Sequence, residues 1–141
     1  MDVADITSEE LPALAGLMRS LSGLDTDMER LGAVHRVMAG HPDYHLLGAR
    51  LDGVLAGAAL GIVCLDVVGE CRPFMVVENV VVAGAFRRRG VGRGLFAALE
   101  ARARARDCLY LMLVSGPDRD AARAFYAALG YFEARGFKKR L

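Results

Sequence analysis

The sequence of 141 residues has no tryptophan, only four prolines and only three cysteines. The cysteines, Cys64, Cys71 and Cys108, are odd in number and form no C-x-x-C pair. They therefore predict reduced, packed thiols rather than a disulfide framework or a zinc site. The scattered prolines exclude a proline-rich linker. With 54% hydrophobic and 25% charged residues, the chain is not intrinsically disordered.

The sequence also lacks a long apolar run. Its longest uncharged stretch, residues 53–65, is shorter than the roughly 18–20 apolar residues that a membrane helix needs. The first ten residues, MDVADITSEE, are acidic and have neither the basic nor the apolar region of a signal peptide. We therefore expect a cytoplasmic protein without a membrane partner.

The sequence also lacks an excess of charge of either sign. Eighteen basic residues against 17 acidic residues give a net charge of +1, which argues against a surface built for nucleic acid or anionic membrane. The length predicts one domain, residues 1–141, because domains usually span roughly 100–200 residues.

Hydrophobic periodicity predicts alternating strands and helices. Glu10 would form a capping box with Thr7 at the start of a helix, and Asp52-Gly53 predicts a hairpin turn. After a weak first strand we expect helices at 8–21, 26–38, 90–106 and 118–129, and strands at 44–50, 54–67, 74–83, 108–114 and within 131–141. This order predicts the α/β (α+β) class, with a central mixed sheet of six to seven strands and helices on both faces.

The segment FMVVENVVVAGAFRRRGVGRG, residues 74–94, combines a valine-rich strand, three arginines and glycines that open a helix. A helix N-terminus with free N–H groups and nearby arginines suits a phosphate. Gly90 and Gly92 would let a ligand approach the main chain. The glycine spacing does not fit a dinucleotide fold, and a P-loop would need Gly-Lys-Ser/Thr. A coenzyme A pyrophosphate cradle and a solvated basic turn remain as alternatives.

Two motifs resemble the GNAT superfamily of acyl-CoA-dependent N-acetyltransferases. Residues 87–92, RRRGVG, resemble the family's R/Q-x-x-G-x-G/A motif, and residues 122–131, ARAFYAALGY, resemble its A-x-x-F-Y-x-x-L-G-F block. The motifs occur in the family's order, and the resemblance is strong from about residue 44 to the end. It implies a single GNAT-like domain with a splayed sheet, acetyl-CoA as acetyl donor and an amine acceptor, without a metal; many members are homodimers.

The resemblance also implies which residues bind the coenzyme. Main-chain groups of the valine strand would pair with the pantetheine arm, and the amides of the arginine–glycine turn would hold the pyrophosphate. The family's usual asparagine in the fourth helix is replaced by Arg119, which would either reach the coenzyme or point to water. The expected cofactor-binding residues are Val80, Val81, Val82, Arg87, Arg88, Arg89, Gly90, Val91, Gly92, Arg93, Arg119 and Tyr126.

Two residues are candidates for proton transfer. Tyr126 matches the family's tyrosine that protonates the leaving thiolate; otherwise it is a core tyrosine. Glu78 and Asn79 are the strongly polar residues of the valine strand, and a period of two sends their side chains to opposite faces. Burial of Glu78 is costly unless the carboxylate is paired or wet, and burial would raise its pKa toward that of a useful base. We expect Glu78 to deprotonate the amine through one water.

Other residues have weaker claims. His35, His41 and His45 could line the acceptor side, although His35 is more often structural on such a helix. A non-catalytic acyl-CoA-binding module and a nucleic-acid binder that uses the arginines are the rival functions. The near-zero net charge opposes nucleic acid, and the presence of Tyr126 and Glu78 favours an enzyme.

Overall fold

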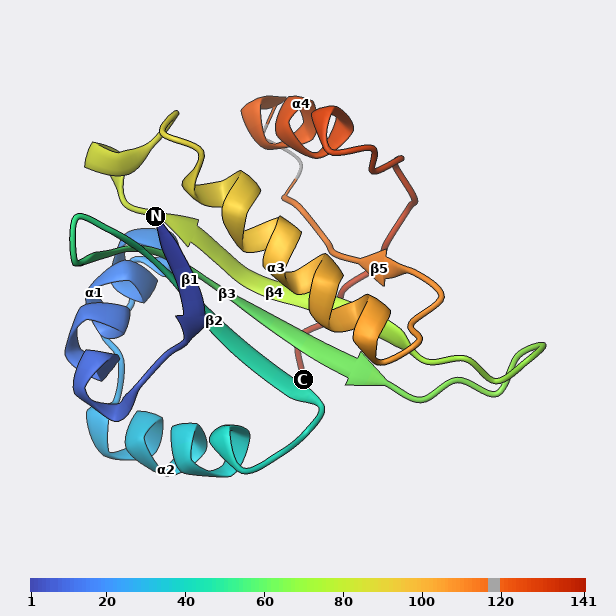
Figure 1. Ribbon diagram of the computed structural model, residues 1–141, viewed down its shortest axis with the longest axis horizontal. Coiled ribbons are helices and arrows are strands. Elements are labelled where there is room, and N and C mark those ends of the chain that lie inside the picture. Colours follow the sequence, from blue (N-terminus) through green and yellow to red (C-terminus); the bar gives the residue numbers. More distant parts are fainter. Residues whose placement is uncertain (117–119) are drawn as a thin grey trace.

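The computed structural model describes residues 1–116 and 120–141, and these ranges form one open sheet with helices on both faces (Figure 1). The five strands follow the order β1-β2-β3-β4-β5; the first four are antiparallel, and β5 is parallel to β4. Their bounds are β1 Asp2–Asp5, β2 Tyr44–Leu51, β3 Val54–Cys64, β4 Phe74–Val82 and β5 Leu111–Met112.

Four α-helices and two short 3₁₀ turns complete the described part of the chain. The helices are α1 Leu11–Ser22, α2 Met28–Ala39, α3 Val91–Ala105 and α4 Asp120–Ala128; the 3₁₀ turns are η1 Ser8–Glu10 and η2 Gly84–Phe86. The predicted capping box is confirmed, since the Thr7 N–H donates to Glu10 Oε2 at 2.9 Å. No helix of the described ranges is long and apolar enough to cross a membrane.

Two apolar cores cover the two faces of the sheet. On one face, α3 packs Val91, Leu95, Phe96 and Leu99 against the sheet, and α4 adds partly buried aromatic residues. On the other face, α1 packs Leu11, Leu14 and Leu17 against Ile6, Ala58 and Val81, with Leu31 of α2 at the margin. Figure 1 shows α3 and α4 on one side of the strands, and α1 and α2 on the other.

Glycines in β3 allow α3 to lie close to the sheet. A Cβ on Gly57 would meet Val91 Cγ1 at 2.9 Å, and one on Gly61 would meet Leu99 Cδ2 at 2.7 Å. A methyl group at either position would require α3 to move outward and β4 atoms to shift as well, since Val81 O lies 2.8 Å from an added Cβ on Gly57 and Met75 Sδ 2.9 Å from one on Gly61. These two positions therefore fix how near the helix start lies to the end of β4.

The hairpin prediction is confirmed, and three other predictions are wrong. Asp52 and Gly53 both have positive φ, 54° and 77°, as a type I′ turn requires. The sheet has five strands instead of six to seven, because residues 131–141 form no strand. The strand expected at 108–114 is present only as β5, Leu111–Met112. Cys71 is exposed with a φ of 55°, so it is not a packed thiol.

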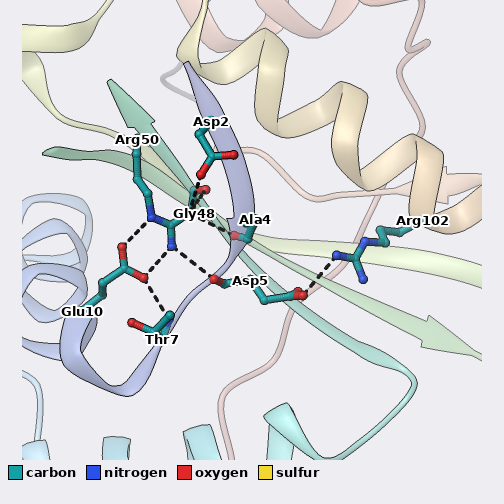
Figure 2. Close-up of polar contacts among 8 residues, drawn as sticks. All are labelled: Asp2, Ala4, Asp5, Thr7, Glu10, Gly48, Arg50 and Arg102. Carbon is teal, nitrogen blue, oxygen red and sulfur yellow. Dashed lines mark hydrogen bonds and ion pairs between the residues drawn. The ribbon is translucent and has the colours of Figure 1, made fainter. Parts of the chain in front are cut away.

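Arg50 joins the first strand to the first helical turn (Figure 2). Its Nε donates to Glu10 Oε1 at 2.6 Å and its Nη2 to Glu10 Oε2 at 2.5 Å, a bidentate pair. Nη1 also donates to the Gly48 carbonyl at 3.0 Å, and Nη2 to the Asp5 carbonyl at 3.1 Å. The side chains of Arg50 and Glu10 are only 17% and 21% exposed. This partly buried fork ties β1, β2 and η1 together.

The fork gives a pH-dependent prediction. Hydrogen bonds from Arg50 lower the pKa of Glu10 from its ordinary 4.5 to about 2. Between pH 4.5 and about pH 2, the Glu10 carboxyl is therefore mostly protonated in the unfolded chain and mostly ionised in the folded chain. The contribution of the ion pair to stability is full above pH 4.5 and is lost as the pH falls toward 2. Glu10→Gln should lower the free energy of unfolding at pH 7 by about 1–3 kcal/mol.

Urea unfolding at pH 7, 5, 4 and 3 measures this effect. The acid-dependent loss assigned to Glu10 should disappear in Glu10→Gln and persist in Glu29→Gln, which changes an exposed glutamate outside the fork. Equal pH profiles for Glu10→Gln and the wild-type chain would show that the ion pair contributes no pH-dependent stability.

Candidate functional site

The sheet opens between β4 and β5. The two parallel strands pair only at Met75–Leu111 and Val76–Met112, and β4 has no ladder partner on that side beyond Val76 within the described residues. A pocket of about 220 Å³ lies at this opening. It is lined by Leu21, Val77, Glu78, Asn79, Val80, Leu113, Val114, Ser115, Gly116 and Tyr126. The splayed sheet thus places parts of α1, β4, α4 and the segment after β5 around one cavity.

A β-bulge in β4 lies at this pocket. Ala58 pairs with Val81 and Leu60 with Glu78, so two β4 residues, Asn79 and Val80, oppose one residue of β3. Asn79 has a φ of 53°, in the left-handed region that asparagine tolerates better than most residues. Before the bulge, Val77 packs in the α3-side core; after it, Val81 packs in the α1-side core. The bulge therefore exchanges the two faces of the strand.

The bulge interrupts the period of two on which the expectation for Glu78 and Asn79 rested. Both residues are exposed, and both line the pocket between β4 and β5. Of the two alternatives for Glu78, a wet carboxylate and a buried, paired one, its exposure agrees with the wet one. Glu78 makes no ion pair among the described residues, so solvent in an open pocket, rather than a structural partner, hydrates the carboxylate.

Tyr126 lies at the same pocket within an aromatic cluster. Its ring contacts Phe96 at a centroid distance of 5.6 Å and Phe125 at 5.4 Å. The Tyr131 N–H donates to the Tyr126 carbonyl at 3.0 Å, after the chain reverses at Gly130, whose φ is 87°. Burial raises the pKa of Tyr131 to about 12. The cluster holds Tyr126 from several sides and leaves it at the pocket that Glu78 also lines.

The basic turn lies between β4 and α3. Gly90 is the N-cap of α3 with a φ of 83°, and the space around its missing Cβ is open. Gly92 has a different role, because an added Cβ would meet the Phe125 ring at 3.1 Å. Gly90 is therefore required for the turn and Gly92 for packing against α4. Arg88 also has a positive φ, 59°.

The arginines of this turn are unequally neutralised. Arg89 lies 3.5 Å from Asp52 and 5.5 Å from the centroid of the Phe86 ring. Arg87, Arg88 and Arg93 are exposed and form no ion pair within the described part of the chain. Free N–H groups at the start of α3 and uncompensated guanidinium groups suit the phosphates of a coenzyme.

The other predicted residues fall into three groups. Val80 and Val82 pack toward the α3-side core, whereas Val81 is buried on the α1 side. Arg119 lies outside the described residues. The three histidines line a separate pocket together with Asp5 and Arg102, so they do not belong to the site that contains Glu78.

Sequence reasoning missed two members of this pocket, Asn79 as a bulge residue and Ser115. Asparagine inside a valine strand was the available signal for the bulge, because it tolerates the left-handed conformation that a bulge requires. No local pattern pointed to Ser115, which reaches the pocket through the divergence of the segment after β5.

Comparison with known proteins agrees with this architecture. Residues 9–131 match the model of the acetyltransferase (GNAT) family, and the chain therefore belongs to that family. An aminoglycoside N(6')-acetyltransferase type 1 from Salmonella enteritidis is 26% identical over 136 residues, which cover 94% of this chain and 92% of that protein.

Solved structures show the same fold. A putative acetyltransferase from Agrobacterium tumefaciens has a TM-score of 0.91 at 27% identity and matches 100% of both chains. The structure of AAC(6')-Iy in complex with the bisubstrate analogue CoA-S-monomethyl-acetylneamine has a TM-score of 0.82 at 25% identity, covering 99% of this chain and 98% of that one. The recognised family and the splayed sheet are confirmed by these comparisons.

The bulge generates a test of local conformation. Asn79→Gly should leave the free energy of unfolding within about 1 kcal/mol of the wild-type value, because glycine adopts positive φ without strain. Asn79→Val should lower it by about 1–3 kcal/mol, because a β-branched residue is strained there. Thermal or urea unfolding measures both, with the β4 substitution Val76→Ile as control; equal stability of the glycine and valine variants would contradict the assigned role.

Proposed function

We propose that the chain transfers an acetyl group from acetyl-CoA to a primary amine of a small molecule or peptide. The observation that carries the proposal is one pocket, between β4 and β5, that is lined by both a solvated carboxylate, Glu78, and a phenol, Tyr126. These two groups could remove a proton from an amine and return one to a leaving group at the same opening.

The residues around the pocket fit the coenzyme chemically. The amides of Arg88 to Gly92 would hold the pyrophosphate, helped by Arg87, Arg89 and Arg93, and the open edge of β4 at residues 80–82 would pair with the pantetheine amides. Acetyl-CoA, when bound, supplies a thioester. For Arg119, which lies outside the described residues and directly before α4 in the sequence, we propose contact with the coenzyme or with solvent.

The chain's own residues would move the protons. Glu78 accepts a proton from the acceptor ammonium through one water, which leaves a neutral amine able to attack the carbonyl carbon. As the new C–N bond forms and the C–S bond breaks, the Tyr126 hydroxyl donates its proton to the departing sulfur. The attacking nitrogen then releases its second proton to the tyrosinate, which yields the neutral amide and restores the Tyr126 hydroxyl, while Glu78 returns its proton to solvent. The acceptor of the Tyr126 proton is the departing thiolate; the ordinary pKa values are about 8.5 for a thiol and about 10 for a phenol.

The relatives suggest an order for testing acceptors. Two curated relatives bear the name aminoglycoside N(6')-acetyltransferase, so we propose aminoglycosides as the first amines to assay, followed by amino sugars, polyamines, amino acids and peptide N-termini. The alternative function is a non-catalytic acyl-CoA-binding module. Release of free thiol that requires both acetyl-CoA and an amine would support the enzyme, whereas CoA binding without turnover of any amine would support the module.

Two proposals concern assembly and location. An exposed apolar tail, with Phe132 91% and Phe137 99% exposed, supports a homodimer in which a second copy covers it. Sedimentation analysis tests this, and a monomer at micromolar concentrations would contradict it. We also propose that the protein acts in the cytoplasm, and the localisation of a fluorescent fusion would test this.

Substitutions of Glu78 and Tyr126 should have different kinetic effects. Glu78→Gln should lower kcat/KM by about 10²-fold or more and remove the acidic limb of its pH profile, since no carboxylate then deprotonates the amine. Tyr126→Phe should lower kcat by a similar factor while leaving the KM for acetyl-CoA within about threefold. Tyr110→Phe is the control, because Tyr110 stacks on Phe74 and does not line the pocket.

The outcomes for the two variants are independent. A normal pH–rate profile in Glu78→Gln would remove Glu78 from the mechanism, and an unchanged kcat in Tyr126→Phe would remove Tyr126. Calorimetry of CoA binding on each variant keeps a loss of activity separate from a loss of the folded site.

The basic turn gives a binding prediction. Replacing Arg87 and Arg89 together with glutamate should weaken CoA binding by at least about tenfold, because two cations beside the phosphates become anions. Isothermal calorimetry at low and high salt measures the change, which should shrink as salt screens the charges. Arg104→Glu, on the exposed side of α3, should retain wild-type affinity; equal affinities for all three proteins would place the coenzyme elsewhere.

A further inference from the structure

A second pocket lies at the opposite edge of the sheet. β1 pairs with β2 only as far as Asp5–Leu47, and one further hydrogen bond joins the Ile6 N–H to the Leu46 carbonyl at 2.9 Å. Beyond this point a cavity of about 250 Å³ lies between α2, the start of β2 and the last turns of α3. It shares no lining residue with the pocket that contains Glu78 and Tyr126.

One buried group in this pocket lacks a partner. The His45 side chain belongs to a residue that is only 8% exposed, and its Nε2 has no hydrogen-bond partner in the described residues. By contrast, the other buried histidine of the pocket, His35, places its Nε2 2.8 Å from the Ile6 carbonyl. Because buried polar groups are nearly always hydrogen-bonded, the free nitrogen of His45 marks a place where an additional molecule would be stabilised.

The charged groups around His45 leave one cation accessible. Arg106 is neutralised, because its Nη2 lies 2.5 Å from Asp43 and its Nη1 donates to the Pro42 carbonyl. Arg102 shares a single 3.1 Å contact with Asp5, and its side chain remains 44% exposed. Since a guanidinium has five N–H donors, Arg102 can bind a further acceptor without releasing Asp5.

We propose that this pocket binds a small oxyanion, a carboxylate or a phosphate, between His45 Nε2 and the Arg102 guanidinium. The neutral imidazole donates from Nε2, and the guanidinium supplies the charge-assisted hydrogen bond. A divalent metal is the less suitable ligand, because the described residues contain no group of three or more ligating side chains arranged for one. The inference concerns a second site and does not depend on the proposed acetyl transfer.

Histidine-detected NMR of the full chain tests the proposal. Burial, followed by the nearby Arg102, lowers the pKa of His45, while Asp5 and Asp43 oppose this effect more weakly. An anion beside the ring should raise that pKa. Titration with sodium phosphate or sodium acetate at constant ionic strength should shift the His45 signals saturably, with a dissociation constant on the order of 1–10 mM for two charge-assisted contacts.

Matched variants and site-resolved signals distinguish the outcomes. His45→Gln and Arg102→Gln should each weaken binding at least fivefold, whereas Arg104→Gln, which removes an arginine of the same helix that pairs with Glu100, should not. Signals of Gly90 and Gly92 report separately on phosphate at the basic turn. Phosphate binding without acetate binding would assign the pocket to phosphates, and the reverse would assign it to carboxylates.

The proposal is overturned if neither anion shifts His45 in the wild-type chain up to 50 mM, about five times the weakest expected dissociation constant, so that bound water alone fills the pocket. It is also overturned if all three arginine and histidine variants lose binding equally. The wild-type titration decides the question even if a variant fails to fold, because it needs no substitution.

Discussion

The divergence of β4 from β5 is the constraint on which the rest of the structure depends. Parallel strands normally continue to exchange hydrogen bonds along their length, but here the ladder ends after Val76–Met112. Main-chain groups beyond this point must find another partner or water, because unpaired buried amides are costly. An opening at this place is therefore favourable only if it stays wet or is filled by a ligand, and it places the side chains after β5 opposite those of β4.

The bulge at Asn79 and the glycines of β3 make the opening useful. The bulge exchanges the faces of β4 next to two exposed pocket residues, Glu78 and Asn79, while Val80 and Val82 pack toward the α3-side core. Gly57 and Gly61 allow α3 to approach the sheet closely, which brings the start of that helix to the end of β4. Glu78 and the basic turn are thus connected by one strand, β4, whose geometry is set by its neighbours.

Local chemistry explains what the sequence could predict. The capping box at Thr7 and the turn at Asp52-Gly53 were predictable because each depends on contacts within a few residues. The length of β5 was not predictable, because it depends on how far β4 runs beside it, and β4 is distant in the sequence. Residues 131–141 have a strand-like composition but no sheet edge of their own chain that they pair with, so periodicity alone overestimated the strand count.

The same distinction holds for the candidate site. Composition singled out Glu78, and resemblance to the family singled out Tyr126, but the 47 residues between them in sequence give no physical reason for their lying at one pocket. Only the sheet divergence does so. The exposure of Glu78 also depends on this divergence, because β5 pairs with β4 only at Met75 and Val76 and does not cover Glu78.

The two edges of the sheet are stabilised in opposite ways. At the β1 edge, the bidentate Arg50–Glu10 pair and three further main-chain contacts of Arg50 close the strand against η1 (Figure 2). At the β5 edge, only two residue pairs join β5 to β4, and the sheet is open beyond them within the described residues. The contacts of Arg50 hold β1 and β2 together with η1, so the strand order is stabilised from the β1 side although the ladder between β4 and β5 is short.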